Sequence, residues 1–186
     1  SAVGIIDYGM GNLHSIARAM ERVAGGSQVV VSYDPDKLLR CDRLMLPGVG
    51  AISACMKELH RLELDQLVQQ VVGKKPLMGI CLGMQALLNH SEENDGIDGL
   101  GIFAGDVRHF DQMQPTAPHK IPHMGWNRVA QTCDHPLWHE IPNNSWFYFV
   151  HSYFVQAQEA TQVAGTASYP NPFAAVLLRE GVFATQ

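Results

Sequence analysis

The stretch from Lys74 to His90, "KKPLMGICLGMQALLNH", decides the fold of this chain. It opens with a short apolar run that is typical of a buried strand, and from Leu82 to about Asn89 it has the pattern of a helix. Cys81 lies at the junction, with Gly79 and Gly83 on either side, in a G-x-C-x-G pattern. That pattern is the thiol counterpart of the G-x-S-x-G turn, which presents a nucleophile between a strand and a helix. We therefore expect a reactive cysteine on a sharp turn at the end of a strand.

Glycine is expected on both sides of Cys81 for a physical reason. A residue on such a turn takes strained backbone angles, and neighbours without side chains let the chain close around it. The following helix would direct N–H groups at the sulfur and favour the thiolate. A buried, unreactive cysteine is the alternative interpretation. The other cysteines, Cys41, Cys55 and Cys133, lack this setting and show no paired spacing, so we expect structural thiols in a reducing, cytoplasmic compartment.

Outward from this stretch, the first half of the chain alternates short apolar runs with helical patterns. Strands are expected at residues 2–7, 27–33, 42–48 and 75–80. One helix follows Asn12 as its N-cap, and a long amphipathic stretch carries Leu59, Leu62, Leu67, Val68 and Val71 on one face. Alternation of this kind predicts a parallel sheet with helices on both faces.

The second half of the chain is different, because strand-like runs follow one another with turn residues between them. These runs are 125–130, 145–157, 162–168, 172–180 and 181–186. They predict antiparallel strands added to the parallel core. We therefore expect a single three-layer α/β domain over residues 1–186, with a mostly parallel central sheet, helices on both faces and antiparallel strands in the C-terminal half.

Composition excludes several classes of function. The 186 residues carry a formal net charge of −5, with 46% apolar and 17% charged residues. No cluster of Lys or Arg is present, which argues against nucleic acid or an anionic membrane as a partner. No apolar run approaches the roughly 18 residues that a membrane-spanning helix needs.

A second loop with the same logic is "PGVG", Pro47 to Gly50, which follows an expected strand. The two glycines around Val49 allow backbone N–H groups to point at a developing oxyanion. A dinucleotide-binding loop would need glycine where Ser53 stands, and no phosphate-binding G-x-x-x-x-G-K-[ST] occurs in the sequence. We therefore expect no nucleotide cofactor.

Nine histidines raise the question of a metal site. His119 and His123, and likewise His135 and His139, stand four residues apart, a spacing that binds metal only on a helix. The prolines Pro118, Pro122 and Pro136 disfavour helices in both places. We expect no metal site.

Four motifs carry a resemblance to a known family. "PGVG", "GICLGMQ", "SEEN" and "FVHSY" stand in the order found in the class I (triad) glutamine amidotransferases, and the resemblance covers essentially the whole chain. "DYGMGN" and "PHMGWNRV" are most similar to the glutaminase subunits of imidazole glycerol phosphate synthases, enzymes of histidine biosynthesis. The resemblance implies hydrolysis of L-glutamine to glutamate and ammonia. It also implies a (βα)8-barrel synthase subunit as heterodimer partner, which takes up the ammonia.

The resemblance also implies roles for single residues. Cys81 would attack the side-chain amide of glutamine and form a thioester, and the oxyanion would receive N–H groups from Leu82 and from Val49 within the Gly48-to-Gly50 loop. The expected substrate contacts are Gln85, Glu93, and the backbone of Ser152 and Tyr153. The expected docking residues are Asn12, Trp126 and Tyr148. Without the resemblance, Glu92 and Glu93 would equally suit a solvated helix end, and "WFYFVHSY" a core strand.

One departure from the family concerns the general base. The family carries Gln-Phe-His-Pro-Glu near its C-terminus, whereas this sequence has "GVFATQ" and ends at Gln186. We expect that the natural chain continues and that the catalytic His and Glu lie beyond Gln186. His90 is expected roughly 13 Å along the helix from Cys81, too far to serve as the base. His151, at the end of a strand, is a weaker alternative.

Three other functions stay open at this point. The chain could be a triad amidotransferase of another pathway, such as anthranilate or pyridoxal phosphate synthesis. It could be a non-catalytic binding protein on the same fold, or a cysteine hydrolase for another substrate class. For the glutaminase we expect slow turnover until the partner binds, with rotation of the Gly48–Gly50 loop as the switch.

Overall fold

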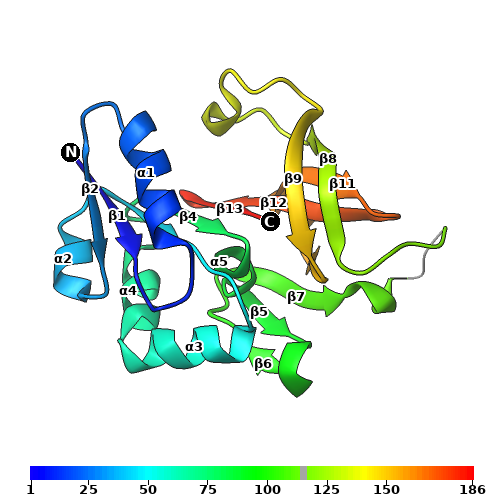
Figure 1. The fold of residues 1–186 in the computed structure, drawn as a ribbon, viewed down its shortest axis with the longest axis horizontal. Coiled ribbons are helices and arrows are strands. Elements are labelled where there is room, and N and C mark those ends of the chain that lie inside the picture. The colour runs from blue at the N-terminus through cyan, green and yellow to red at the C-terminus, as the bar shows by residue number, and fades with distance from the viewer. Residues whose placement is uncertain (114–116) are drawn as a thin grey trace.

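The computed structural model describes residues 1–113 and 117–186, and it contains one mixed sheet flanked by helices (Figure 1). Its strands are β1 Ala2–Ile6, β2 Gln28–Ser32, β3 Arg43–Leu46, β4 Leu77–Ile80, β5 Leu88–Ser91, β6 Ile97–Asp98, β7 Phe103–His109, β8 His123–Gln131, β9 Ser145–His151, β10 Tyr153–Ala157, β11 Val163–Ser168, β12 Pro172–Arg179 and β13 Val182–Thr185. Its α-helices are α1 Leu13–Val23, α2 Pro35–Leu39, α3 Ile52–Arg61, α4 Leu64–Val71 and α5 Leu82–Gln85. Short 3-10 turns follow at η1 Glu93–Asp95, η2 Phe110–Gln112, η3 Pro136–Trp138 and η4 Ala160–Gln162.

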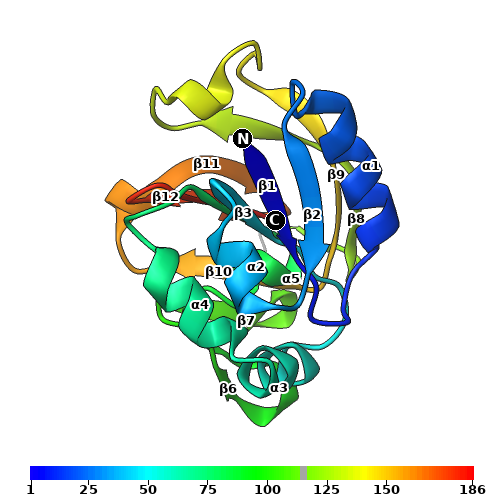
Figure 2. The ribbon, with the colours of Figure 1, turned by 90° about the vertical axis from the view of Figure 1, so that its left-hand side faces the viewer.

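The N-terminal half forms the parallel part of the sheet. Its order is β2-β1-β3-β4, and β13 from the C-terminal half lies next to β4; each neighbouring pair in this series is parallel. Helix α1 lies on one side of β1 and β2, while α2 and α4 lie on the other (Figure 2). The three-layer α/β arrangement expected from the alternating pattern is confirmed. Because these strands are parallel, their carboxyl ends meet at one edge of the sheet, where binding sites of such folds lie.

The C-terminal half supplies the antiparallel strands, as expected. β13 pairs antiparallel with β12, and β12 in turn with β10 and β11. Strands β8 and β9 form an antiparallel hairpin that joins the sheet through β11 and stands away from the parallel half in Figure 1. β13 is therefore the seam between the two halves, since it is hydrogen-bonded to β4 on one side and to β12 on the other.

One local expectation was wrong, and several local features were not predicted. The helix after Cys81 ends at Gln85 rather than near Asn89, and Leu88–Ser91 is strand β5, because it pairs with β7. The long amphipathic stretch is two helices, since Glu63 takes a left-handed conformation with φ of 58° between them. Helix α2 and strands β5 to β7 were not predicted.

The apolar core is divided in the same way as the sheet. The larger buried cluster lies between the parallel strands and helices α2 to α5, and the smaller one lies beneath the β8–β9 hairpin. In the described part of the chain, no helix has the length and apolar character needed to cross a membrane.

Candidate active site

Cys81 lies on a strained turn between β4 and α5. Its backbone angles are φ 54° and ψ −116°, a region that residues with a side chain rarely adopt. Its N–H donates to the Thr185 carbonyl at 2.8 Å, which ties the turn to the end of β13. Its side chain is half-buried, and Sγ lies 3.8 Å from the Gln186 carbonyl oxygen. The sharp turn that the G-x-C-x-G pattern predicts is therefore present.

The two glycines of the pattern are needed for close approach. A Cβ on Gly83 would lie 1.9 Å from the Leu46 carbonyl oxygen, so only glycine lets α5 begin against the end of β3. A Cβ on Gly79 would lie 2.9 Å from the Leu87 side chain and 3.1 Å from the Gly83 carbonyl oxygen. The turn is therefore held by its neighbours rather than by flexible chain.

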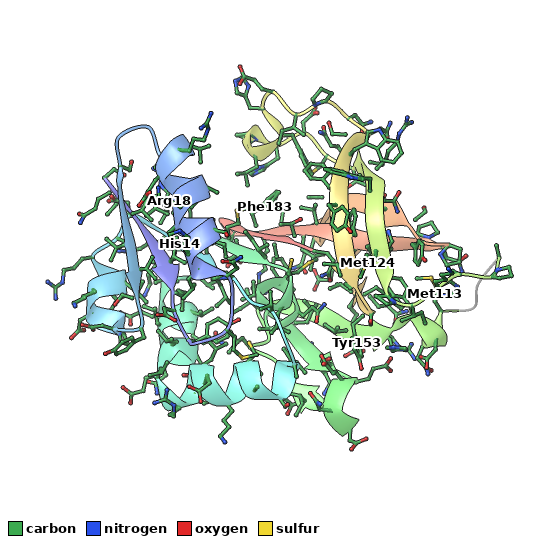
Figure 3. All side chains as sticks on the ribbon, viewed as in Figure 1. His14, Arg18, Met113, Met124, Tyr153 and Phe183 are labelled. Carbon is green, nitrogen blue, oxygen red and sulfur yellow. The ribbon has the colours of Figure 1, made fainter. Side chains whose placement is uncertain are left out.

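A cavity of about 440 Å³ lies in front of Cys81. Its lining comes from both halves of the sequence. The residues are Gly48, Val49, Gly50, Cys81, Leu82, Gln85, Glu93, Pro122, Val150, His151, Ser152, Tyr153 and Gln186. The structure thus brings together the expected nucleophile, the expected oxyanion loop and all four expected substrate contacts. Tyr153, at the start of β10, is labelled in Figure 3.

In this structure a carbonyl of the oxyanion loop accepts from one of the N–H groups that were expected to bind the oxyanion. The Leu82 N–H, expected to face an oxyanion, donates to the Gly48 carbonyl oxygen at 3.4 Å. Tyr8 holds the preceding residue, because its hydroxyl donates to the Pro47 carbonyl at 2.6 Å. Val49 is exposed, and Gly50 has φ of 103°, which glycine adopts without cost. In this state a carbonyl rather than a pair of N–H groups faces Leu82.

Two polar side chains line the cavity beside the cysteine. Gln85 is buried, with 7% of its surface exposed, and its Nε2 donates to Gln186 Oε1 at 3.0 Å. Burial raises the pKa of the Glu93 carboxyl, while a hydrogen bond from the Ile52 N–H lowers it. Glu93 is therefore a half-buried acid at the N-terminus of α3. Its neighbour Glu92 instead accepts from the His109 N–H and lies 3.8 Å from Arg108, so it ties η1 to β7.

The protonation of Cys81 differs from the expectation. Burial raises the pKa of its thiol. The helix that was expected to favour the thiolate has only four residues, and a helix that short supplies little of the dipole. The sulfur of the isolated chain is therefore mostly a protonated thiol, and it needs a proton acceptor to become a nucleophile.

The expected docking residues fall in two places. Trp126 and Tyr148 lie opposite each other on the β8–β9 hairpin, 68% and 56% exposed, with ring centroids 5.6 Å apart. Met124 and Val150, paired next to them, are also exposed; we call these four residues the aromatic face. Met124 is labelled in Figure 3. Asn12 lies elsewhere, at the start of α1, where its side chain accepts from the Ser15 N–H at 3.3 Å.

Comparison with known families identifies the architecture around this cysteine. A family model described as class I glutamine amidotransferase matches residues 4–186. The chain belongs to the class I glutamine amidotransferases. This amidotransferase is 53% identical over 186 residues to the imidazole glycerol phosphate synthase subunit HisH of Pseudomonas putida, covering 99% of this chain and 87% of that protein. It is 51% identical to the protein of that name from Methylococcus capsulatus over 190 residues, covering 100% and 88%.

Solved structures agree on the fold of this amidotransferase. A crystal structure titled as a glutamine amidotransferase superposes with a TM-score of 0.74 at 15% identity, covering 100% of this chain and 88% of that one. The PurLQS structure from Thermotoga maritima gives a TM-score of 0.66 at 15% identity, with coverage of 100% and 85%. At this identity the likeness concerns the fold alone.

Sequence reasoning missed part of the amidotransferase site. Pro122 and Val150 line the cavity, and neither carries chemistry that a motif search would detect. His151, considered in the sequence only as a weaker alternative base, lines it too, and its contact with the buried His123 was not predicted. The spacing of 28 residues between these histidines has no helical or metal-site meaning, and only the hairpin register brings them together. His90 lies on β5, paired with Asp98 at 3.1 Å, and not on a helix as expected.

Proposed function

We propose that this chain is the glutaminase subunit of an imidazole glycerol phosphate synthase in histidine biosynthesis. It hydrolyses L-glutamine to glutamate and ammonia, and a synthase subunit uses the ammonia. The observation that carries the proposal is Cys81 on a strained turn, facing a cavity that also presents Gln85 and Glu93. Relatives that are 53% and 51% identical bear the name of that synthase subunit.

The chemistry begins with attack of Cys81 Sγ on the side-chain carbonyl carbon of glutamine. The carbonyl becomes a tetrahedral oxyanion, and its collapse breaks the C–N bond, leaves a thioester on Cys81 and releases ammonia once the nitrogen is protonated. Water then hydrolyses the thioester to glutamate and restores the thiol. In this proposal Glu93 pairs with the α-ammonium of glutamine. Gln85 and the backbone of Ser152 and Tyr153 hold the rest of the amino acid.

The oxyanion needs a rearrangement of the Pro47–Gly50 loop. The Gly48 carbonyl and the Val49 N–H belong to one peptide group and point in opposite directions. Rotation of that group would remove the carbonyl from the Leu82 N–H and bring the Val49 N–H to the same place. Two donors would then converge on the oxyanion, an arrangement worth several kcal/mol in acyl transfer. The flanking glycines allow this rotation.

The proton acceptor is the remaining requirement. The Gln186 carbonyl oxygen lies 3.8 Å from Cys81 Sγ, next to the end of β13. A proton acceptor placed at this end of the strand would therefore be within reach of the thiol.

The partner in this proposal is a (βα)8-barrel synthase subunit that docks on the aromatic face. Exposed aromatic side chains are typical centres of protein interfaces. Asn12 is a further docking residue in this proposal, away from the aromatic face, and the loop before it contacts the oxyanion loop, since a Cβ on Gly50 would lie 2.9 Å from the Met10 side chain. Docking there could rotate the Gly48–Val49 peptide. The four unpaired thiols, Cys41, Cys55, Cys81 and Cys133, support a cytoplasmic location.

The test is covalent labelling with 6-diazo-5-oxo-L-norleucine, an electrophile that mimics glutamine. We expect stoichiometric labelling at Cys81, protection by L-glutamine, and none at Cys41, Cys55 or Cys133; a Cys81→Ser variant is the control. In the complex with the synthase subunit, labelling and glutamine turnover should accelerate when the ligand of the synthase is added. Indiscriminate labelling of the four thiols would contradict the glutaminase assignment, and equal rates with and without the partner would contradict the loop switch.

A further inference from the structure

His123 and His151 face each other on the buried side of the β8–β9 hairpin. They are register partners, 3% and 6% exposed, and His123 Nδ1 lies 2.8 Å from His151 Nε2. The ring of His123 is stacked between Phe149 and Tyr169, with centroid distances of 4.9 and 4.1 Å. Nothing in the proposed chemistry uses this pair, although two buried imidazoles in contact are costly unless every nitrogen has a partner.

The protons of this pair are fixed from the Asn127 end. The Asn127 amide has one orientation, because its Nδ2 donates to the Ser168 carbonyl at 2.9 Å and its Oδ1 accepts from the Arg128 N–H at 2.8 Å. The second hydrogen of Nδ2 faces His123 Nε2 at 3.3 Å, so that nitrogen must accept. His123 then carries its proton on Nδ1 and donates to His151 Nε2.

The hydrogen bond between His151 and Tyr153 independently indicates the same proton positions. His151 Nδ1 lies 2.7 Å from the Tyr153 carbonyl oxygen, and a carbonyl can only accept. His151 therefore carries its proton on Nδ1 and accepts at Nε2, as the Asn127 end requires. The hydrogen bonds run in one direction, from Asn127 through His123 and His151 to the Tyr153 carbonyl; we call these four groups the histidine network.

The histidine network ends at the substrate cavity. His151, Ser152 and Tyr153 all line it, and the network holds the Tyr153 carbonyl from one side. The 3-10 turn η2 holds the adjacent residue from another side, because the Phe110 N–H donates to the Ser152 carbonyl at 3.1 Å. Burial lowers the pKa of both imidazoles to about 4, so both stay neutral and the directions stay fixed near neutral pH.

We propose that His123, which does not line the cavity, is a positioning residue for glutamine binding, acting through His151 on the Ser152–Tyr153 backbone. This inference rests on the proposed glutaminase function and on the proposed role of that backbone. It also gives the hairpin a second role, since the aromatic face is on its outer side and the network on its inner side. A shift of β8 on docking would then move the Ser152–Tyr153 backbone at the cavity, through the hydrogen bonds of the histidine network.

The first test is spectroscopic. Nitrogen-15 NMR of the imidazoles should show His123 and His151 both protonated at Nδ1 and unprotonated at Nε2 at neutral pH. In an Asn127→Ala variant the Tyr153 end still fixes the protons of both rings, so we expect His123 to keep its proton on Nδ1, while the nitrogen-15 resonance of its Nε2 shifts because that atom loses its donor. Protonation of either ring at Nε2 in the unmodified chain would overturn the inference.

The second test separates binding from chemistry. In His123→Phe the aromatic stacking stays, but His151 Nε2 loses its hydrogen-bond donor. We therefore expect the half-saturating concentration of 6-diazo-5-oxo-L-norleucine, measured in the complex with the synthase subunit, to rise about fivefold. This rise corresponds to about 1 kcal/mol of binding free energy, at 1.4 kcal/mol per tenfold. The limiting rate of Cys81 labelling should not change. Asn127→Ala should show a smaller rise in the same concentration.

The matched control is Tyr169→Phe, which keeps the ring on His123 and removes only the hydroxyl that donates to the Lys120 carbonyl. It should leave both constants unchanged. An equal rise in Tyr169→Phe, a lower limiting rate alone, or unchanged constants in both network variants would overturn the inference. If His123→Phe does not fold, the half-saturating concentration of the Asn127→Ala variant is the test of the inference. This variant is suitable because Asn127 is half-exposed and does not line the cavity. Failure of the unmodified protein to label at Cys81 in the complex with the synthase subunit would instead refute the glutaminase function itself.

Discussion

At the scale of single residues, Cys81 combines a strained backbone that presents its side chain with a thiol that is mostly protonated. The residue takes φ 54° and ψ −116°, the mirror image of an ordinary extended conformation, which costs a residue with a side chain on the order of 1–3 kcal/mol. Burial also raises the pKa of its thiol, so the isolated chain holds the nucleophile in position but in its unreactive form. The local pattern predicted the turn, whereas the protonation depends on burial by distant segments and could not be predicted.

A Cys81→Gly variant should therefore be inactive but more stable than the unmodified chain. Glycine adopts the mirror-image region without strain, so we expect the free energy of unfolding to rise by about 1 kcal/mol after the larger entropy loss of glycine. Urea unfolding at neutral pH measures it. Cys81→Ala, which keeps the strained angles, is the control and should not be stabilised; a glycine variant less stable than the alanine variant would contradict the strain.

At the scale of elements, the β8–β9 hairpin is apolar on both faces. Its outer side carries the aromatic face, and its inner side carries Phe149 with the buried histidine pair. Both strands were predicted, but alternation could not show which face is buried, because neither side is polar enough to mark the solvent. The sequence offered His123 only as half of a rejected metal pair and His151 only as a weaker alternative base, whereas both are buried core residues in contact with each other.

The histidine pair predicts a pH dependence of stability. The pKa of each ring is about 4 in the folded chain and near 6.5 when unfolded. Between these values the unfolded chain binds protons that the folded chain does not, so the stability present above pH 6.5 falls as the pH drops toward 4. At pH 5 the loss is about 2 kcal/mol for each histidine that stays neutral, at about 1.4 kcal/mol per pKa unit.

Urea unfolding at a series of pH values measures this loss. His123→Phe removes one of the two titrating groups and should flatten the dependence in the acid range, which separates the pair from surface carboxylates. A steep loss of stability above pH 7, or an unchanged slope in the variant, would contradict it.

At the scale of the whole molecule, the site lies on the seam between the two halves of the sheet. Cys81 and the oxyanion loop belong to the parallel half, while Ser152 and Tyr153 belong to the antiparallel half. The seam exists because β13, which follows every other described element in the sequence, inserts between β4 and β12. Local patterns predicted both halves and the motif residues on their loops. They could not predict this insertion, since strand order is decided by packing between residues far apart in sequence.

The proposed interface can be tested apart from the fold. Because Trp126 and Tyr148 are exposed, replacing either with alanine should change the free energy of unfolding by less than about 0.5 kcal/mol. Affinity for the synthase subunit should fall by about 2 kcal/mol or more, as for aromatic residues at the centre of an interface. Isothermal titration calorimetry measures the affinity. Val23→Ala, at an exposed position of α1, is the control, and equal affinities for all three variants would exclude the aromatic face as the docking surface.

The position of β9 has a consequence for the living cell. Among the described strands it pairs only with β8, and its seven residues, Ser145 to His151, include no Lys, Arg, Asp or Glu. An uncharged, aromatic outermost strand is a template for self-association unless another surface shields it. If the proposed synthase subunit is the partner, copies of this chain made in excess of it would be the first to aggregate or be degraded, so balanced synthesis of the two subunits would matter as much as the affinity between them.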